Sequence, residues 1–97
     1  MDEVRMKLFT KKDYHIGDGR QIELTTNVDG TIAQRGQTQH TAYVWIPDNK
    51  AEPTIRLSLW QGASGYSILE AKAIGAILTE AVKLARRAKT IQKRIQT

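Results

Sequence analysis

The sequence predicts an α+β fold, in which an antiparallel sheet of about four strands is followed by one long C-terminal helix packed on one face of the sheet. Three observations support this prediction. Apolar and polar residues alternate in segments between residues 21 and 60, apolar spacings of three and four residues take over after residue 66, and 97 residues suffice for only one domain. We therefore expect a single domain over residues 1–97.

The N-terminal segments are less regular than those that follow. Residues 4–9 alternate apolar with basic side chains at first, so residues 1–13 are expected to form an arm or an edge strand. Residues 14–19 predict a turn-rich connector, and residues 21–26 predict a strand with Ile22 and Leu24 on one face. Asp29-Gly30 predicts a turn, with residues 31–35 as the returning hairpin strand and residues 36–40 as a loop.

The two most regular strands lie in the middle of the chain. Residues 41–46 are rich in β-branched and aromatic side chains and stop at Pro47. Residues 54–60 alternate without exception and end in a glycine-containing segment. We expect these two strands to pair in an antiparallel hairpin across a loop of about seven residues.

Alternation assigns the side chains of these strands to two faces. The aliphatic set is expected beneath the helix and comprises Ala42, Val44, Ile46, Ile55, Leu57 and Leu59. The opposite set comprises Tyr43, Trp45, Arg56, Ser58 and Trp60. Aromatic rings can stack on nucleic-acid bases, and an arginine adds attraction for phosphate, so this face is a candidate binding surface. Alternatively, the N-terminal arm or a second subunit closes it, with the rings as interface anchors.

A helix is predicted from residue 68 to residue 95. Ser67 and Glu70 fit a capping box, and an apolar stripe follows that comprises Ile74, Ile77, Leu78, Ala81, Leu84, Ala85, Ala88, Ile91 and Ile95. Such a helix is about 40 Å long and a seven-residue strand about 23 Å, so the last two or three turns should extend beyond the sheet. A second copy of the helix would cover this stripe, which predicts a homodimer through the C-terminal helix, and Gly75 would mark a close approach to a strand or to the partner helix.

The formal net charge of +5 is concentrated at the C-terminus. Residues 1–80 hold nine basic residues and all ten acidic residues, whereas residues 81–97 hold six basic residues and no acid. These six are Lys83, Arg86, Arg87, Lys89, Lys93 and Arg94. We predict that they hold phosphates. The alternative is a basic helix end that complements the helix dipole and keeps the protein soluble.

The sequence gives little support for catalysis or metal binding. The absence of cysteine excludes disulfides, thiol catalysis and thiolate metal sites, and both His15 and His40 are expected to be surface histidines. No motif for nucleotide binding, nucleophilic hydrolysis or zinc is present, so we expect no enzyme, no metal and no cofactor. No apolar run is long enough for a membrane span, and the acidic start is unlike a signal peptide, so we expect no membrane partner and a cytoplasmic location.

Residues 53–80 contain a strand with the sequence PTIRLSLW, a glycine-containing loop, the segment GYSILEA and an apolar helix. This order resembles the second half of the positive cofactor four family. The resemblance implies a four-stranded curved sheet packed on a helix, homodimerisation through the helices, and single-stranded DNA on the opposite sheet face, where Arg56 and Trp60 would lie. Two features depart from the family pattern: the loop before Tyr66 is short, and the helix continues into a basic extension.

These patterns together favour a small non-enzymatic nucleic-acid-binding protein, with single-stranded DNA as the expected ligand and little sequence specificity. The basic helix would hold phosphates, and bases would stack on the sheet face. The alternative is a protein-interaction module, such as an inhibitor or accessory factor of a phage or mobile element, that binds a partner protein through the aromatic face or the helix. An acidic protein partner would fit the basic helix equally well.

Overall fold

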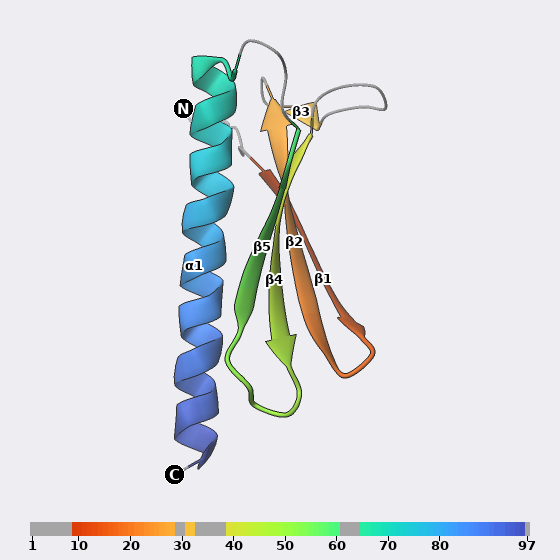
Figure 1. The fold of residues 1–97 in the computed structure, drawn as a ribbon, viewed down its shortest axis with the longest axis vertical. Helices are drawn as coiled ribbons and strands as arrows, with labels where there is room; N and C mark the ends of the chain where they lie inside the picture. Colours follow the sequence, from red (N-terminus) through yellow and green to blue (C-terminus); the bar gives the residue numbers. More distant parts are fainter. Residues whose placement is uncertain (1–8, 29–30, 33–38, 61–64, 97) are drawn as a thin grey trace, which may run out of the picture.

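The computed structural model describes residues 9–28, 31–32, 39–60 and 65–96. In chain order the elements are β1 (Phe9–Ile16), β2 (Gly19–Val28), β3 (Thr31–Ile32), β4 (His40–Pro47), β5 (Thr54–Leu59) and α1 (Ile68–Gln96). The sheet has the order β1-β2-β4-β5 with every neighbouring pair antiparallel, and the short β3 pairs with the end of β2. α1 lies along one side of this sheet (Figure 1), so the predicted α+β fold is confirmed.

The first hairpin differs from the prediction. Most of the predicted strand 4–9 lies outside the described residues, and β1 instead runs from Phe9 through Ile16, where a connector was predicted. Ile16 pairs with Gly19 across a two-residue turn, in which Gly17 has a φ of +60°. A glycine with positive φ at the first turn position is typical of a type II′ hairpin turn, which joins two strands directly. Within the described residues, positions 9–13 therefore lie in an edge strand of the sheet.

The remaining strands follow the predictions closely. Thr31–Ile32 pairs with the end of β2, and residues 33–35 of the predicted return strand lie outside the described residues. β4 begins at His40, which the sequence assigned to a loop. β4 and β5 pair antiparallel from Trp45 opposite Thr54 to His40 opposite Leu59, so the predicted central hairpin is confirmed.

The core lies between α1 and the inner face of β2 and β4. Alternate residues of these strands point inward and meet one stripe of the helix. The fully buried apolar side chains are Ile22, Leu24, Ala42, Val44, Ala73, Ile77 and Ala81. Two of the three helical positions are alanines, which have short side chains and allow the helix backbone to lie close to the sheet. The predicted stripe contained Ile77 and Ala81 but not Ala73.

The inner side of β5 is less covered than the sequence predicted. Leu57 and Leu59 point to the same face as Ala42 and Val44, yet both remain partly exposed to solvent. α1 lies mainly over β2 and β4. One helix with its side chains is about 10 Å wide and strands are about 4.8 Å apart, so a single helix covers roughly two strands. Leu78 of the predicted stripe is also partly exposed.

Both ends of α1 follow the predictions made from the sequence. The predicted capping box is confirmed: the Glu70 amide donates to Ser67 Oγ at 3.0 Å and the Ser67 amide donates to Glu70 Oε1 at 3.3 Å. The C-terminal end of α1 extends past the strands (Figure 1).

A Cβ at Gly75 would meet no atom within 4 Å, so the predicted close approach to a strand is wrong. In the described part of the chain, no helix combines the length and apolar character needed to span a bilayer.

Candidate nucleic-acid interface

The face of the sheet opposite α1, called the outer face below, carries a mixed polar and aromatic surface. The pairing register arranges its side chains in three rows across the strands. The first row is Thr10, Thr25, Thr41 and Ser58; the second is Lys12, Glu23, Tyr43 and Arg56; the third is Tyr14, Gln21, Trp45 and Thr54. Rows on one face repeat every two residues, so neighbouring rows lie about 7 Å apart.

Arg56 and Tyr43 form a stacked pair in the second row. The guanidinium carbon of Arg56 lies 4.4 Å from the centroid of the Tyr43 ring. A cation at this distance is attracted by the ring, and the planar guanidinium keeps hydrogen-bond donors for a phosphate or a face for a base. The ring therefore positions the arginine, so a base would stack on Arg56 rather than directly on the ring face that Arg56 occupies.

Trp45, in the third row, lies over Gly19 of β2. A Cβ on Gly19 would lie 2.5 Å from Cη2 and Cζ2 of the Trp45 ring, which is closer than real contacts allow. The absence of a side chain at Gly19 therefore leaves room for this part of the indole beside β2. Trp45 as a whole is half-buried.

Tyr14 joins the outer face although the sequence placed it in a connector. Its hydroxyl donates to a carboxylate oxygen of Glu23 and accepts from Gln21 Nε2 at 2.7 Å. The hydrogen bond to the Glu23 carboxylate raises the pKa of Tyr14 above its ordinary value of 10.0, so the phenol is neutral at physiological pH. The Gly17-Asp18 pair, a hairpin signal, could have predicted that this residue lies in a strand.

The described cations of the predicted phosphate-binding set lie on the solvent side of α1. The side chains of Lys83, Arg86, Arg87 and Lys89 are exposed, while those of Lys93 and Arg94 lie outside the described part. Of the four, only Lys89 has a described ion pair, with Nζ 3.5 Å from Glu52 Oε2. Both partners are largely exposed, so this pair is weak and leaves the positive charge of the segment in place.

The structure separates the two halves of the predicted site. α1 packs on the inner face, whereas Tyr43, Trp45 and Arg56 lie on the outer face, so the sheet stands between the basic helix and the rings. In the described part of the chain, the two surfaces come near each other at the end where the β4–β5 loop lies. Lys89 contacts the loop between β4 and β5, and Trp45 lies two residues before the end of β4, at the same end of the sheet.

Trp60 is not part of the row that contains Trp45. It follows the last residue of β5, and its amide donates to His40 Nδ1 at 3.1 Å. The residue is half exposed. The structure thus brings Arg56, Tyr43 and Trp45 together and leaves Trp60 at the opposite end of β5, next to the start of α1.

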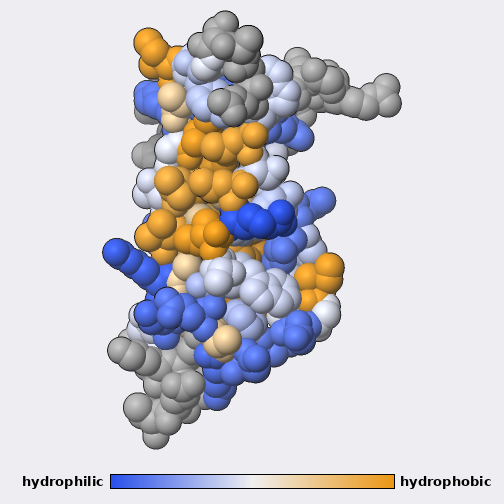
Figure 2. Space-filling model, in the orientation of Figure 1, coloured by the Kyte–Doolittle hydropathy of each residue, from blue (hydrophilic) through white to orange (hydrophobic). Residues whose placement is uncertain are grey.

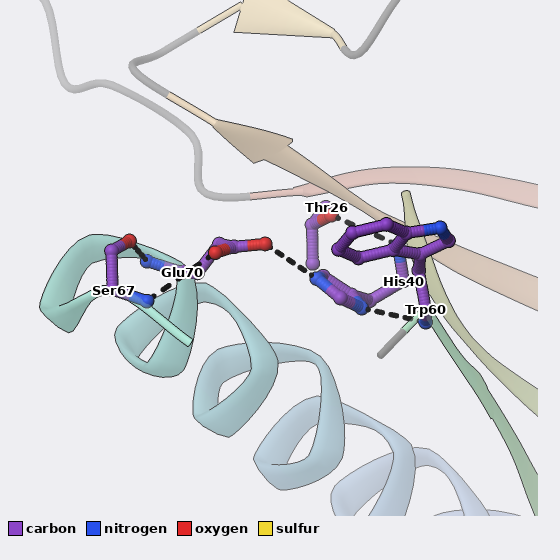
Figure 3. Close-up of polar contacts among 5 residues, drawn as sticks. All are labelled: Thr26, His40, Trp60, Ser67 and Glu70. Carbon is purple, nitrogen blue, oxygen red and sulfur yellow. Dashed lines mark hydrogen bonds and ion pairs between the residues drawn. The ribbon is translucent and has the colours of Figure 1, made fainter. Parts of the chain in front are cut away.

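His40 is the centre of a polar cluster at that end (Figure 3), and its side chain is completely buried, so the surface position predicted for it is wrong. Because Nδ1 accepts from the Trp60 amide, the ring proton is on Nε2, which donates to Glu70 Oε2 at 3.0 Å. The His40 amide donates to Thr26 Oγ1, and Tyr66 packs edge-on against the ring at 5.2 Å. The cluster therefore joins β2, β4 and the start of α1.

The hydrogen bond from His40 lowers the pKa of Glu70 below its ordinary value of 4.5, and the amide of Ser67 adds to this effect. Glu70 is therefore ionised at neutral pH, and its carboxylate accepts hydrogen bonds from both the Ser67 amide of the helix cap and His40. In these contacts, the polar groups of the cluster bind one another and hold the elements together.

A further polar contact involves the second histidine. His15 is exposed, as predicted, and its Nε2 lies 3.1 Å from the Asp48 carboxylate at the ends of β1 and β4. In the ranges that the structure describes, no group of three or more histidine or acidic side chains could hold a metal ion.

Comparisons with protein-family models, curated proteins and solved structures give no match to this chain.

Proposed function

We propose that this chain binds single-stranded nucleic acid, without marked sequence preference, around the end of the molecule where the β4–β5 loop meets α1. Phosphates would contact the cations of α1, and one or two bases would reach the outer face. The observation that carries the proposal is the group of exposed cations on α1, of which Lys83, Arg86 and Arg87 have no described acidic partner. Clustered exposed cations attract polyanions, and the counterions of the polyanion are released on binding.

The choice of a single strand is supported by the outer face. Tyr43 with Arg56, and Trp45, offer flat groups that stack on unpaired bases, which a duplex does not expose. Stacking contributes about 1–3 kcal/mol per base and tolerates any base, which fits a ligand read without base-specific hydrogen bonds. The threonine and serine hydroxyls of the first row add donors for phosphate oxygens.

The path of the strand follows from the separation of the two surfaces. Arg86 and Lys89 line a shallow groove with Glu52 and Ile55, which brings the cations to the side of the β4–β5 loop. A strand that passes around this loop would leave the helix and reach Trp45 on the outer face without crossing the sheet. Binding groups on both sides of this end of the molecule would suit a site of about 4–16 nucleotides, the range covered by small domains that bind single strands.

The test is fluorescence anisotropy with a labelled oligothymidylate of about 16 nucleotides and a duplex of equal length, each at about 50 and 200 mM salt. We expect tighter binding of the single strand and a steep loss of affinity at the higher salt concentration. A matched control replaces Lys72, an exposed cation in the N-terminal half of α1, by glutamine and should leave binding unchanged. No binding of the single strand at the lower salt concentration would exclude the proposal.

A second candidate, a module that binds another protein, is favoured by the partly exposed Leu57, Leu59, Leu78 and Val82. Apolar side chains at the surface next to an open strand edge are typical of protein interfaces. This function predicts no response to oligonucleotides in the anisotropy experiment. It also predicts that changes to these four residues, rather than to the cations, abolish partner binding.

A further inference from the structure

A groove runs along α1 and reaches the start of β5. Among the described residues, two neighbouring hollows form it and share Val82 and Arg86. The first hollow, of about 510 Å³, is lined by a stripe of α1 that comprises Leu78, Thr79, Val82, Lys83 and Arg86. The second, of about 300 Å³, adds Pro53 and Ile55 around the start of β5. The two hollows together are called the groove below.

The groove adjoins a strand edge that lacks the usual protection. Within the described residues, β5 pairs only with β4, and β1 pairs only with β2, so both strands are edges of the sheet. β1 carries three consecutive charged residues at positions 11–13, which discourage pairing with another chain. β5 carries one charge, Arg56, on the outer face, and five of its six residues are exposed. β5 can therefore accept a further strand.

The groove is basic toward the C-terminal part of α1 and apolar toward its other end. Arg86 lines it together with Ile55 at the start of β5. Because β5 and α1 run in opposite directions (Figure 1), the partly exposed Leu57 and Leu59 lie further toward the start of the helix, as does Leu78. Figure 2 shows hydrophobic residues gathered over the helix and the adjacent strand, with hydrophilic residues toward the C-terminal end of the helix.

The charges of the groove favour an acidic ligand. Glu52 is the acid among its described lining residues, and it lies 3.5 Å from Lys89 Nζ. Lys83 and Arg86 have no described acidic partner. A ligand carboxylate placed here would accept charge-assisted hydrogen bonds from both cations. The groove therefore suits a ligand in which acidic groups follow apolar ones.

We propose that the groove binds an extended acidic segment of another protein, which adds to the sheet as a strand antiparallel to β5. Apolar side chains at alternate positions of this segment would contact Leu57, Leu59 and Leu78, and acidic residues at its C-terminal end would meet Lys83 and Arg86. An antiparallel direction continues the pairing of the whole sheet. Main-chain hydrogen bonds to the strand edge give affinity in such complexes, and alternate side chains give specificity.

The chemistry of the groove distinguishes this occupant from two others. A second copy of the chain that used the same groove would bring its own Lys83 and Arg86 to the contact, and like charges repel. Nucleic-acid bases stack on flat groups, whereas the exposed side chains at the apolar end are leucines. The inference goes beyond nucleic-acid binding and does not rest on it. Because both ligands would use Lys83 and Arg86, they would compete.

The first test is fluorescence anisotropy with a labelled synthetic peptide of about ten residues at about 50 mM salt. Isoleucine and threonine alternate in this peptide, and glutamates form its C-terminal end. We expect saturable binding, and binding weaker by about tenfold for a peptide with lysines in place of the glutamates. Two further peptides carry N-methyl groups on one or the other set of alternate amides. Only the set that faces β5 makes hydrogen bonds to it, so one methylated peptide should bind and the other should not.

The second test changes the protein, with circular dichroism as the control for folding. Lys83→Gln with Arg86→Gln should weaken binding of the glutamate peptide by about tenfold, because two exposed ion pairs are lost. Arg87→Gln is the matched control: Arg87 is exposed on the same helix but is not among the residues that line the groove, so binding should be unchanged. Nucleic-acid binding instead predicts that Arg86 and Arg87 both contribute, so the two functions can fail separately.

Three results would overturn the proposal. The first is a glutamate peptide that does not bind the wild type, and the second is equal binding of the glutamate and lysine peptides. The third is equal binding of the two methylated peptides, which would exclude strand addition. Light scattering of the chain without peptide adds a further outcome: twice the 10.9 kDa of one chain, falling to 10.9 kDa in Leu57→Thr with Leu78→Gln, would assign the groove to a second copy and also overturn the proposal.

Discussion

Replacing Lys83, Arg86 and Arg87 by glutamine should make the salt dependence of nucleic-acid binding clearly shallower while the fold is retained. The three side chains are exposed and have no described acidic partner. Substitutions at such positions usually change the free energy of unfolding by less than about 0.5 kcal/mol. A truncation after Glu80 is a poorer experiment, because it removes buried Ala81 and the partly buried Leu84 together with the cations.

The magnitude follows from the number of phosphate contacts that are lost. Each contact with a single strand contributes about 0.7 to the slope of log affinity against log salt concentration. If all three cations contact phosphates, the slope should become shallower by about 2. The difference between wild type and variant should then be large at low salt and small at high salt, because counterion release is the term that has been removed.

The assay is a salt titration of oligothymidylate binding by fluorescence anisotropy, with circular dichroism melts of both proteins as the control for folding. Lys72→Gln serves as the matched single-charge control on the same helix. An unchanged slope in the triple variant would refute the assignment of phosphates to α1. Loss of binding together with a lowered melting temperature would mean that the cations stabilise the fold, which also contradicts the reasoning.

Four further predictions concern stability and the outer face. Gly75→Ala should raise the free energy of unfolding by up to about 1 kcal/mol in urea denaturation at low protein concentration, because a Cβ there has open space; a loss would contradict this. Gly19→Ala should cost about 1–3 kcal/mol and shift the emission of Trp45, since the added methyl collides with its ring; an unshifted spectrum would argue against the packing. His40→Leu should cost about 1–3 kcal/mol, because the Trp60 amide loses its acceptor; an unchanged urea midpoint would show that water replaces the ring. The folded-state pKa of Glu70 is lowered, so its contribution is complete above its ordinary pKa of 4.5 and lost as the pH falls through the folded value; Glu70→Gln, which keeps the cap, should flatten this acid decline in pH-dependent melts, and an unaltered profile would assign the decline to other acids.

The strands and the helix were predictable where one periodicity dominates. β4, β5 and α1 follow from strict alternation, turn residues and a capping box, each of which is a local property of the chain. β1 was not recognised because Lys11, Lys12 and Asp13 interrupt the apolar alternation of an edge strand. Only the Gly17-Asp18 turn indicated that this segment continues as one arm of a hairpin.

The positions of individual side chains depended on packing that the sequence does not contain. His40 is buried because β4 begins at this residue and its ring meets both the end of β5 and Glu70, 30 residues later in the chain. Alternation placed Leu57 and Leu59 on the correct face but could not show that the helix covers only two strands. The aromatic face was identified in the same way, whereas its separation from the basic helix required the three-dimensional arrangement.

The most direct measurement is the tryptophan fluorescence of a Trp60→Phe variant, in which Trp45 is the remaining tryptophan, during titration with oligothymidylate. If one strand contacts both the cations of α1 and the outer face, emission should be quenched at low salt, and the quenching should disappear in high salt and in the Lys83, Arg86 and Arg87 triple variant. Constant emission of Trp45 under conditions where anisotropy reports binding would contradict a shared site, and it would confine the nucleic acid to the helix.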